Sequence, residues 1–495
     1  MDLSRKNNTP SLPVEWGLLS LCSVLVFFLY GNTLTGEFLF DDLRLIPNNP
    51  AIRLQELTLG GLAKAAFTTR PVAMVSFALN YYFHQYAVAG YHVVNILIHI
   101  ATGIFLYFFI KSTINLPSLK DRYGHNRYLA LVVALVWMVN PLHTQTVSYI
   151  VQRMNGLAAM FYILSMLCYV QARIADGQPV KRTLLSACCG LSALFALGSK
   201  EIAATLPFFI LLYEWFFFQE MSRKWLRTAS FILAAILVAT GALFFLFPQF
   251  LPAGILTKGY EPYPFTMGQR LLTESRVVML YLGLLFFPHP SRLNLDYDFP
   301  VSYSLFQPST TFLSILCILS LILVAVCIAS REPLLSYCIL WFFGNLVIES
   351  TVIPLDLVFE QRTYLPSMLV ILLVVLLVER FWRVYPLPKL IAFFLVVAVC
   401  SFWTVERNRD WSNALTMMID NAEKSPDKAR PAYNVACEFA KAGKVHEALV
   451  WLERAVGKDD FNRWDLIRYD KDLDGIRATR EFADFYQKVV PLEKK

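Results

Sequence analysis

The sequence predicts an all-α, polytopic membrane protein. Three observations support this fold class: 56% of the 495 residues are hydrophobic, only 16% are charged, and the mean hydropathy is +0.49. Charged residues make up about 25% of an average soluble domain. The apolar residues form runs separated by short basic segments, a pattern typical of many membrane helices rather than of one large soluble core.

The apolar runs predict the positions of the membrane helices. A bilayer core of about 30 Å needs about 20 helical residues, and shorter runs are tolerated in proteins with many spans. Eleven runs qualify, centred on residues 16–35, 92–110, 128–142, 155–171, 183–198, 202–218, 229–248, 310–330, 334–348, 364–378 and 388–404. A twelfth run, 277–288, reaches only about 18 Å as a helix. We expect it to lie along or partly within the far side of the membrane.

Basic residues predict which loops face the cytoplasm, because cytoplasmic loops carry an excess of Lys and Arg. With eleven spans, and with 277–288 not crossing, all basic clusters fall on one side. These clusters are Arg5 and Lys6; Lys111, Lys120, Arg122 and Arg127; Arg173, Lys181 and Arg182; Arg223, Lys224 and Arg227; Arg331; and Arg380, Arg383 and Lys389. The N-terminus is then cytoplasmic and the C-terminus lies outside. The first residues are too polar for a signal peptide.

Polar segments converge on the opposite, outer side of the membrane. The first outer loop, residues 36–91, opens with FLFDDLRLIPNN (38–49) directly after the first span. The others are NPLHTQTVSYIVQR (140–153), SKE (199–201), PHPSRLNLDYD (288–298) and FEQRTYLP (359–366). Residues able to carry chemistry are therefore expected on one face.

The composition changes after residue 404, which predicts a membrane domain over 1–404 and a helical region over 405–495. Residues 430–456 show the helix-turn-helix spacing of a tetratricopeptide repeat (TPR). The positions that match are Ala432, Tyr433, Ala436, Ala440, Gly443, Ala448, Leu449 and Ala455. One or two such repeats rarely stand alone, because each buries its apolar face on a neighbour. We expect this region to pack on itself or on the outer loops.

The composition also argues against several function classes. The net charge is +7, but the basic residues sit in short clusters between apolar runs, which indicates topology rather than nucleic-acid binding. Eight of the nine cysteines lie within apolar runs, and Cys437 stands alone elsewhere. There is accordingly neither a disulfide framework nor a zinc-binding spacing.

Six segments carry a family resemblance across nearly the whole chain, in order. They are FLFDDLRLIPNN, RPVAMVSFALNYYFHQYAVAGYHVVNILIH, NPLHTQTVSYIVQRMNGLAAMFY, GSKEIAATLPFFILLYEW, YLGLLFFPHPSRLNLDYD and FEQRTYLPS. With the C-terminal repeat, they resemble the transmembrane and tetratricopeptide-repeat (TMTC-type) glycosyltransferases and their bacterial relatives. Each motif is short and modestly specific, whereas six in sequence are a strong signal.

The resemblance implies a GT-C-type bundle of about eleven helices with an acidic motif in the first outer loop. It implies a glycosyltransferase that moves a sugar from a polyprenyl-phosphate-linked donor to a protein or glycan acceptor on the outer face, as in protein O-glycosylation. Animal relatives carry a long repeat array, whereas this chain has one or two units. Its short length suits a bacterial inner membrane, with membrane lipids around it and a periplasmic C-terminus.

Asp41 and Asp42 are the predicted catalytic residues. Transfer to a hydroxyl needs a base that takes the hydroxyl proton, and a carboxylate pair at the membrane surface favours that role. The resemblance points to Asp41 as the base, with Asp42 orienting or assisting it. The alternative is that one aspartate caps a helix beginning at Leu43. Family members divide over metal use, so a divalent ion (Mg²⁺ or Mn²⁺) at this pair stays open.

The donor phosphate needs cations or hydrogen-bond donors, and the candidates are Arg153, Lys200, Arg362 and His143. Arg offers a planar fork of donors and Lys a point charge. The alternative is that Lys200 pairs with Glu201, and Arg362 with Glu360, as interfacial anchors. His143 is alternatively a satisfied interfacial histidine.

The remaining predicted site residues border a substrate or acceptor groove: Arg70, His84, Glu201, Glu360 and Tyr364. Residues 58–67 predict an amphipathic helix on the membrane surface, which would wall such a groove or merely pack. A polar stripe on one helix face is expected to make interhelical hydrogen bonds rather than bind metal; it consists of His92, Asn95 and His99. Turns are expected at Asn48, Asn49, Asp296 and Asp298.

Two other function classes compete with a glycosyltransferase. A non-catalytic scaffold would recruit a periplasmic partner through the repeat, and a transporter would place ionisable residues near the bilayer midplane, often in paired repeats. Here the informative charges lie at the outer edge, and the two halves show no repetition. The scaffold leaves the six family segments unexplained and survives only if Asp41 is dispensable.

Overall fold

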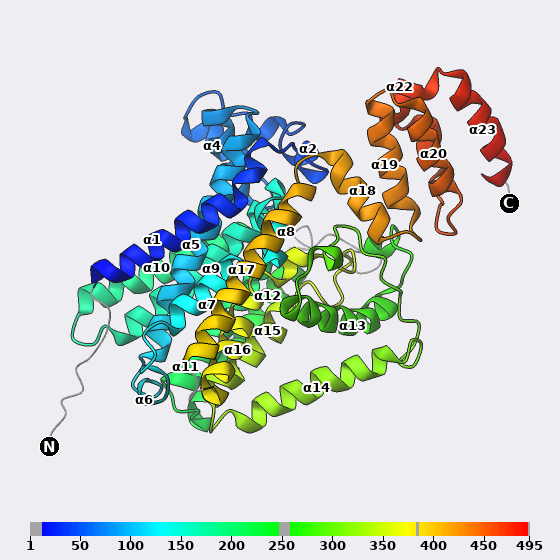
Figure 1. Cartoon of the computed structure of the whole chain (residues 1–495). Coiled ribbons are helices and arrows are strands. Elements are labelled where there is room, and N and C mark those ends of the chain that lie inside the picture. The colour runs from blue at the N-terminus through cyan, green and yellow to red at the C-terminus, as the bar shows by residue number, and fades with distance from the viewer. Residues whose placement is uncertain (1–11, 247–257, 383–385, 494–495) are drawn as a thin grey trace.

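The computed structural model describes residues 12–246, 258–382 and 386–493, and every regular element in these ranges is a helix (Figure 1). They hold 23 α-helices joined by short 3-10 turns. The predicted all-α, polytopic membrane fold is confirmed. Three residues used to predict the topology, Arg5, Lys6 and Arg383, lie outside the described residues.

Six helices within the described ranges are long and apolar enough to cross a membrane. They are α1 (Leu12–Tyr30), α5 (Val88–Ile114), α9 (Arg153–Ile174), α10 (Pro179–Leu197), α14 (Thr310–Ile328) and α17 (Pro386–Asp410). A seventh span results if α7 (Leu129–Met138) and the segment Pro141–Val147 count as one helix bent by 53°. These correspond to seven of the eleven predicted spans, and the other four stay predictions.

The four other predicted spans coincide with shorter or partly described helices. They are α11 (Leu206–Phe217), α12 (Arg223–Leu246), α15 (Pro333–Leu346) and α16 (Ser367–Phe381). The 3-10 turns Glu201–Thr205 and Glu360–Thr363 precede α11 and α16 and shorten these helices. Both turns carry predicted site residues.

Residues 277–286 form the second half of a longer helix, α13 (Met267–Phe286), and residues 287 and 288 follow its end. A reciprocal cap between Thr266 and Gln269 starts this helix upstream of the apolar run. It buries Arg270 and Glu274 and packs along α14 (Figure 1). α13 is not among the helices that qualify as membrane spans in the described part of the chain.

The centre of the bundle is filled by aromatic side chains, and the largest that are fully buried include Trp137, Trp341 and Tyr213. Glycine permits two close helix contacts. A Cβ at Gly103 would lie 2.3 Å from the Met138 sulfur, and one at Gly344 would lie 2.5 Å from the Phe209 ring. Small residues at such contacts let helices associate in lipid through close packing.

The polar segments meet at one end of the bundle, which we call the polar end. Its helices are α2 (Asp41–Leu45), α3 (Leu59–Ala66), α4 (Pro71–His84) and α8 (Thr144–Val147), with the turns at Pro141–His143, Ile150–Gln152 and Glu360–Thr363. α8 contacts all three turns. The helix predicted over 58–67 is α3, which leaves Leu59 and the following Phe67 largely exposed.

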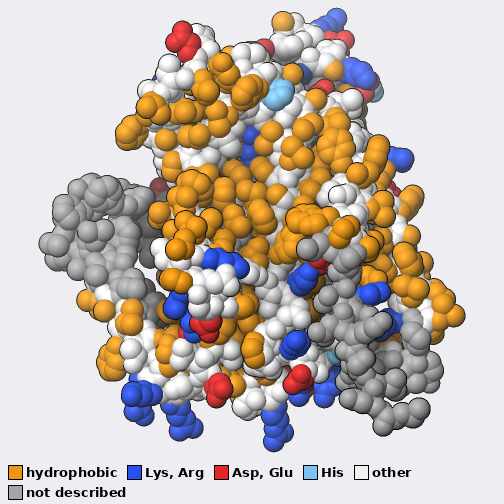
Figure 2. Space-filling view, turned by 90° about the vertical axis from the view of Figure 1, so that its left-hand side faces the viewer, with side chains coloured by type: hydrophobic (Ala, Val, Ile, Leu, Met, Phe, Trp, Pro, Cys, Tyr) orange, Lys and Arg blue, Asp and Glu red, His pale blue; other side chains and the backbone are white. Residues whose placement is uncertain are grey.

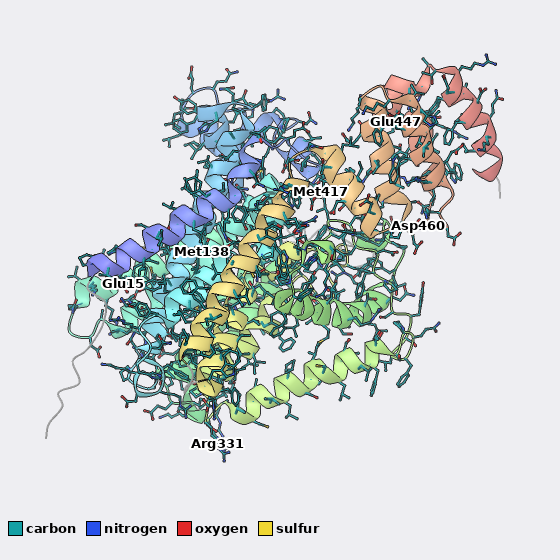
Figure 3. All side chains as sticks on the ribbon, viewed as in Figure 1. Glu15, Met138, Arg331, Met417, Glu447 and Asp460 are labelled. Atoms are coloured by element: carbon teal, nitrogen blue, oxygen red, sulfur yellow. The ribbon has the colours of Figure 1, made fainter. Side chains whose placement is uncertain are left out.

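The opposite end of the bundle carries α6 (Lys120–Tyr123) and Arg331 (Figures 1 and 3). Lys and Arg side chains gather along this lower rim in Figure 2, beneath a broad belt of hydrophobic side chains. This distribution agrees with the sequence pattern in which basic residues cluster on one side of the membrane.

The chain after α17 forms a separate group of helices at the polar end. They are α18 (Ala414–Lys424), α19 (Ala429–Lys441), α20 (Val445–Val456), α21 (Trp464–Tyr469), α22 (Asp474–Arg477) and α23 (Arg480–Glu493). From Ala432 onward they share a core of their own. α18 and its C-terminal end also dock on the 288–298 segment, since Asn421 accepts a hydrogen bond from Leu295 N–H and Ser425 one from the Asn294 amide. The region therefore packs both on itself and on the 288–298 loop.

An ion pair between Asp296 and Arg430 strengthens this docking. Asp296 is buried, and Arg430 donates two hydrogen bonds of 2.6 Å to its carboxylate. Burial alone would raise the pKa of Asp296, but the Arg430 guanidinium outweighs burial and holds the pKa below its ordinary value.

We expect Arg430→Gln to loosen the docking of the start of α19 by about 1–2 kcal/mol, because a two-bond contact is lost but Arg430 is partly exposed to solvent. Hydrogen exchange of residues 429–441 would measure the effect. Arg463→Gln breaks the exposed pair with Asp465 and is the control that should leave exchange unchanged. The lowered pKa contributes stability that is present above about pH 4 and lost as the pH falls further. Equal protection in Arg430→Gln and wild type would contradict this assignment.

Candidate active site

Asp41 and Asp42 stand at the start of α2, where their carboxylates face different surroundings. Asp42 is buried; its Oδ1 accepts a 2.6 Å hydrogen bond from Val151 N–H and its Oδ2 a 3.0 Å bond from Leu39 N–H. Burial raises the pKa of Asp42 to about 8, against the effect of both donors. The Asp41 side chain is exposed, while its backbone N–H donates a 3.0 Å bond to the Tyr149 hydroxyl.

The helix-capping alternative for these aspartates is wrong. α2 begins at Asp41 rather than at Leu43, and its N-cap is Phe40, whose side chain makes no capping bond. The Asp42 carboxylate instead turns back to Leu39. Phe40 has a φ of 46°, a left-handed backbone conformation that a bulky side chain rarely adopts. Surrounding contacts have to hold this strained residue in place.

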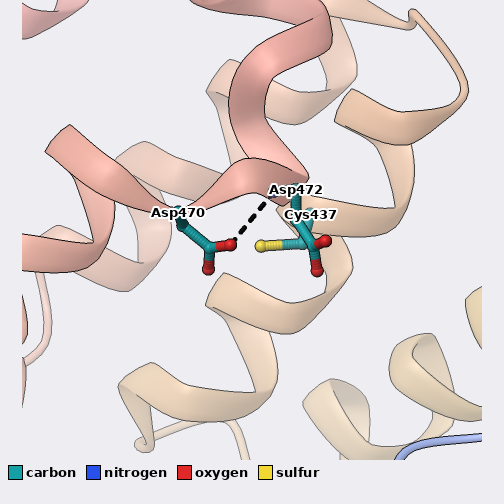
Figure 4. Close-up of side chains that lie close together, drawn as sticks. All are labelled: Cys437, Asp470 and Asp472. Atoms are coloured by element: carbon teal, nitrogen blue, oxygen red, sulfur yellow. Dashed lines mark hydrogen bonds between the residues drawn. The ribbon is translucent and has the colours of Figure 1, made fainter. Parts of the chain in front are cut away.

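Both oxygens of Asp42 accept hydrogen bonds from N–H groups, and Asp41 and Asp42 do not belong to a cluster of three potential metal ligands among the described residues. Among the described residues, one group of three metal-ligand types lies within 4.8 Å of one another: Cys437, Asp470 and Asp472 (Figure 4). Asp470 accepts a hydrogen bond from Tyr433, and Asp472 pairs with Lys441 at 2.9 Å. Existing partners account for both carboxylates, so we assign no metal to either place.

Arg153, a predicted phosphate ligand, is buried among neutral acceptors. Its guanidinium donates to the side-chain oxygens of Asn95 at 2.7 Å and Asn80 at 2.6 Å, and to the carbonyls of Ser76 and Tyr91. It joins α4, α5 and α9 in this way. A donor phosphate would have to displace these bonds, so the geometry favours a structural role.

Lys200 is buried and pairs with Glu349 at 2.8 Å while also donating to the Asn155 side chain at 3.1 Å. The alternative pairing with Glu201 is wrong, because the Lys200 amine meets Glu349 and Asn155 instead. Glu201 instead accepts two hydrogen bonds, of 3.0 and 3.1 Å, from Arg70. Arg70 and Glu201 are both partly exposed.

Arg362 is also buried. The alternative in which it pairs with Glu360 is wrong. It lies 3.8 Å from Glu274 and donates to the carbonyls of Asp356 and Leu357. Its Nε has no hydrogen-bond partner among the described residues. Glu360 points elsewhere and accepts a hydrogen bond of 2.6 Å from Asn294 N–H.

His143 and Tyr364 belong to a fully buried aromatic group. The His143 ring centre lies 4.9 Å from that of Trp137 and 5.0 Å from that of Tyr364. Neither His143 nitrogen has a hydrogen-bond partner in the described part of the chain. His99 bonds both Tyr364 and the Met138 carbonyl, as expected of an interhelical histidine. The ring of His143 is thus covered by other rings, away from any exposed phosphate site.

The other predicted groove residue, His84, is exposed at the end of α4. Its Nδ1 lies 3.2 Å from the Asn80 amide nitrogen. Its ring covers Gly90, where a Cβ would come within 2.4 Å of it. Asn80 also binds Arg153, so a chain of hydrogen bonds links His84 to the buried Arg153.

A charge cluster at the polar end contains residues that sequence reasoning missed. We define it as Arg70, Lys200, Arg270 and Arg362 with Glu201, Glu274 and Glu349. Four positive and three negative groups leave one excess positive charge. Arg270 lies 2.7 Å from Glu274. The sequence contains one signal for Arg270 and Glu274. They are charged residues spaced four apart in the segment directly before the apolar run 277–288.

An apolar groove of about 550 Å³ opens between α13, α14, α15 and α16. Its lining includes Leu282, Phe286, Leu321, Phe342, Val370 and Trp382. Phe342 and Val370 also pack in a cluster with Tyr281. The Tyr281 hydroxyl accepts a hydrogen bond from Phe359 N–H, just before the turn that carries Arg362. Tyr281 therefore connects the lining of the groove to the turn that carries Arg362. The volume of the groove is in the usual range of ligand sites.

Comparison with curated proteins finds distant relatives over most of the chain. The protein O-mannosyl-transferase F38B6.6 of Caenorhabditis elegans is 22% identical over 462 residues, covering 89% of this chain and 61% of that protein. The protein O-mannosyl-transferase Tmtc3 of Drosophila melanogaster is 23% identical over 511 residues, covering 88% and 54%. The protein O-mannosyl-transferase tmtc2 of Xenopus laevis is 30% identical over 226 residues, covering 43% and 25%.

This chain therefore spans 25% to 61% of the length of these three relatives. No family model matches the sequence, and no solved structure matches it.

We expect Asp42→Asn to lower the free energy of unfolding by about 1–3 kcal/mol, because an amide nitrogen would face a backbone N–H donor. Asp41→Asn leaves those bonds intact and should change it by less than about 0.5 kcal/mol. Thermal unfolding of both variants in the same detergent gives the comparison. An Asp42→Asn protein as stable as wild type would mean that the buried carboxylate does not hold the turn.

Proposed function

The chain is a distant relative of the TMTC-type protein O-mannosyl-transferases, as its motifs predicted, and on this premise we propose that it is an integral-membrane glycosyltransferase of GT-C type. It moves a sugar from a polyprenyl-phosphate-linked donor to a protein hydroxyl. The observation that carries the proposal is the exposed Asp41 carboxylate, held beside a buried partner on a fixed turn at the polar end.

In the proposed reaction, Asp41 is the general base. Its carboxylate takes the proton of the acceptor hydroxyl while that oxygen bonds to the anomeric carbon of the sugar. The bond between this carbon and the donor phosphate breaks, and its electron pair leaves with the phosphate on the polyprenol. A positioned base contributes about 10²–10⁴-fold to such a step. Asp42 acts by orienting the turn.

The charge cluster supports donor binding through its field. Its one excess positive charge favours an anionic phosphate nearby. Arg70 is the partly exposed cation of the cluster, so it is the direct phosphate ligand in this proposal. Lys200 is neutralised by Glu349, and the excess positive charge comes from Arg270 and Arg362, which share the single carboxylate of Glu274. The apolar groove offers a place for the polyprenyl chain.

The same proposal places the polar end on the outer face of a bacterial-type inner membrane, with eleven spans. The basic rim at the opposite end (Figure 2) supports this orientation. The helices after α17 then lie in the periplasm, next to the acceptor protein.

The wild-type protein, purified and placed in lipid vesicles, should transfer mannose from polyprenyl-phosphate mannose to a Ser- and Thr-containing peptide. Asp41→Asn should lower the rate by about 10²–10⁴-fold because the proton acceptor is lost. Glu37→Gln, which neutralises another exposed carboxylate in the same loop, is the matched control and should retain activity. Full activity of Asp41→Asn would exclude it as the base. An inactive wild type across a panel of lipid-linked sugars would favour the scaffold function.

The orientation has its own test. Alkaline phosphatase fused after Lys495 folds only outside the bacterial cytoplasm, so the fusion should be active. The same reporter placed in the loop after α5, next to Lys120, should be inactive. The reverse pattern would put the candidate site on the cytoplasmic face and remove the proposed access to a periplasmic acceptor.

A further inference from the structure

Tyr149 and Val151 hold the Asp41–Asp42 turn from a distant part of the chain. The Asp41 N–H donates to the Tyr149 hydroxyl at 3.0 Å, and Val151 N–H donates to Asp42 at 2.6 Å. These bonds join residues 108 and 109 positions apart. Tyr149 and Val151 thus hold two adjacent residues, Asp41 and Asp42. Two attachments fix both the position and the orientation of the turn.

The Tyr149 hydroxyl that accepts from Asp41 N–H is also subject to the charge of the two carboxylates of this turn. Burial, together with the charges of Asp42 and Asp41, raises the pKa of Tyr149 well above its ordinary value. The phenol therefore keeps its proton while accepting from the N–H.

The Tyr149 ring is itself immobilised. It stacks on Trp411 with ring centres 5.3 Å apart and an interplanar angle of 26°, and Phe40 meets it edge-on at 6.2 Å. Tyr149 and Trp411 are 4% and 1% exposed. Trp411 directly follows α17, so the last turn of that helix is the support behind the tyrosine.

The strained backbone of Phe40 explains why such support is needed. Its φ of 46° is a conformation that persists only where the surroundings determine it. The hydrogen bond to Tyr149 is made by the very next residue, and the Phe40 ring packs on Tyr149 as well. Loss of the hydroxyl would free the Asp41 N–H beside a residue that favours another conformation.

We propose that Tyr149, supported by Trp411, is a positioning residue that fixes Asp41 for catalysis. The hydroxyl acts through Asp41 and need not touch the sugar or the acceptor. This inference rests on the proposed function for its catalytic part, while the contact itself can be tested without any assay of transfer.

Hydrogen exchange tests the contact in the full-length protein in lipid nanodiscs. Tyr149→Phe keeps the ring and its stack but removes the hydroxyl, so exchange in a peptide covering residues 38–46 should speed up at least several-fold. Tyr433→Phe removes another buried tyrosine hydroxyl that bonds an aspartate and should leave that peptide unchanged. Unaltered exchange in Tyr149→Phe would overturn the proposal, whether or not the protein transfers sugar.

A double-mutant cycle tests the role in transfer, with polyprenyl-phosphate mannose as donor. Tyr149→Phe should lower kcat by about 10–100-fold with little change in the donor KM, as expected when a reacting group is misplaced. In the Asp41→Asn background the same change should cost nothing further, because its target is gone. Losses that multiply would show that Tyr149 acts independently of Asp41 and would overturn the proposal. An inactive wild type would refute the proposed function, and the exchange result would then decide on the contact alone.

Discussion

Charges buried at the polar end must be neutralised where they stand, because removal from water costs several kcal/mol per ion unless a partner replaces the water. Lys200 meets Glu349, and Arg362 lies between Glu274 and the carbonyls of its own loop. Each carboxylate comes from a different part of the chain than its cation. The ion pairs therefore fix where the turns lie against α13 and the segment after α15, in addition to the apolar packing.

Asp41 is set apart by this rule. It makes no ion pair among the described residues and its side chain is exposed, whereas Asp42 next to it is buried and bonded through both oxygens. An exposed carboxylate thus stands on a turn that hydrogen bonds hold in place. Such pre-organisation is what a general base requires, since a supporting shell has to hold it close to its working position.

The sequence predicted the all-α membrane fold and the convergence of the polar segments on one end of the bundle, because apolar runs and basic clusters are local signals. It did not predict the partners of the charges. Lys200 and Glu201 are neighbours in sequence, yet Lys200 pairs with Glu349, which lies 149 positions away. The buried Arg270 and Glu274 were not predicted, because they lie outside the apolar run 277–288 and their burial depends on contacts with distant segments. Asp41 could be chosen over Asp42 only by resemblance, because their different burial follows from a turn that no local pattern encodes.

The helices after α17 are joined to the candidate site by more than chain connectivity. Trp411 lies at the corner between α17 and α18 and stacks on Tyr149, which bonds Asp41. On the other side, Ser425 accepts from the Asn294 amide, and Asn294 N–H donates to Glu360 in the turn that also carries Arg362. The α18 region thus contacts both the support of the acidic turn, through Trp411, and the loop that bonds the Glu360 turn, through Ser425. Its hydrogen bonds and ring stacking connect two segments that lie far apart in the sequence.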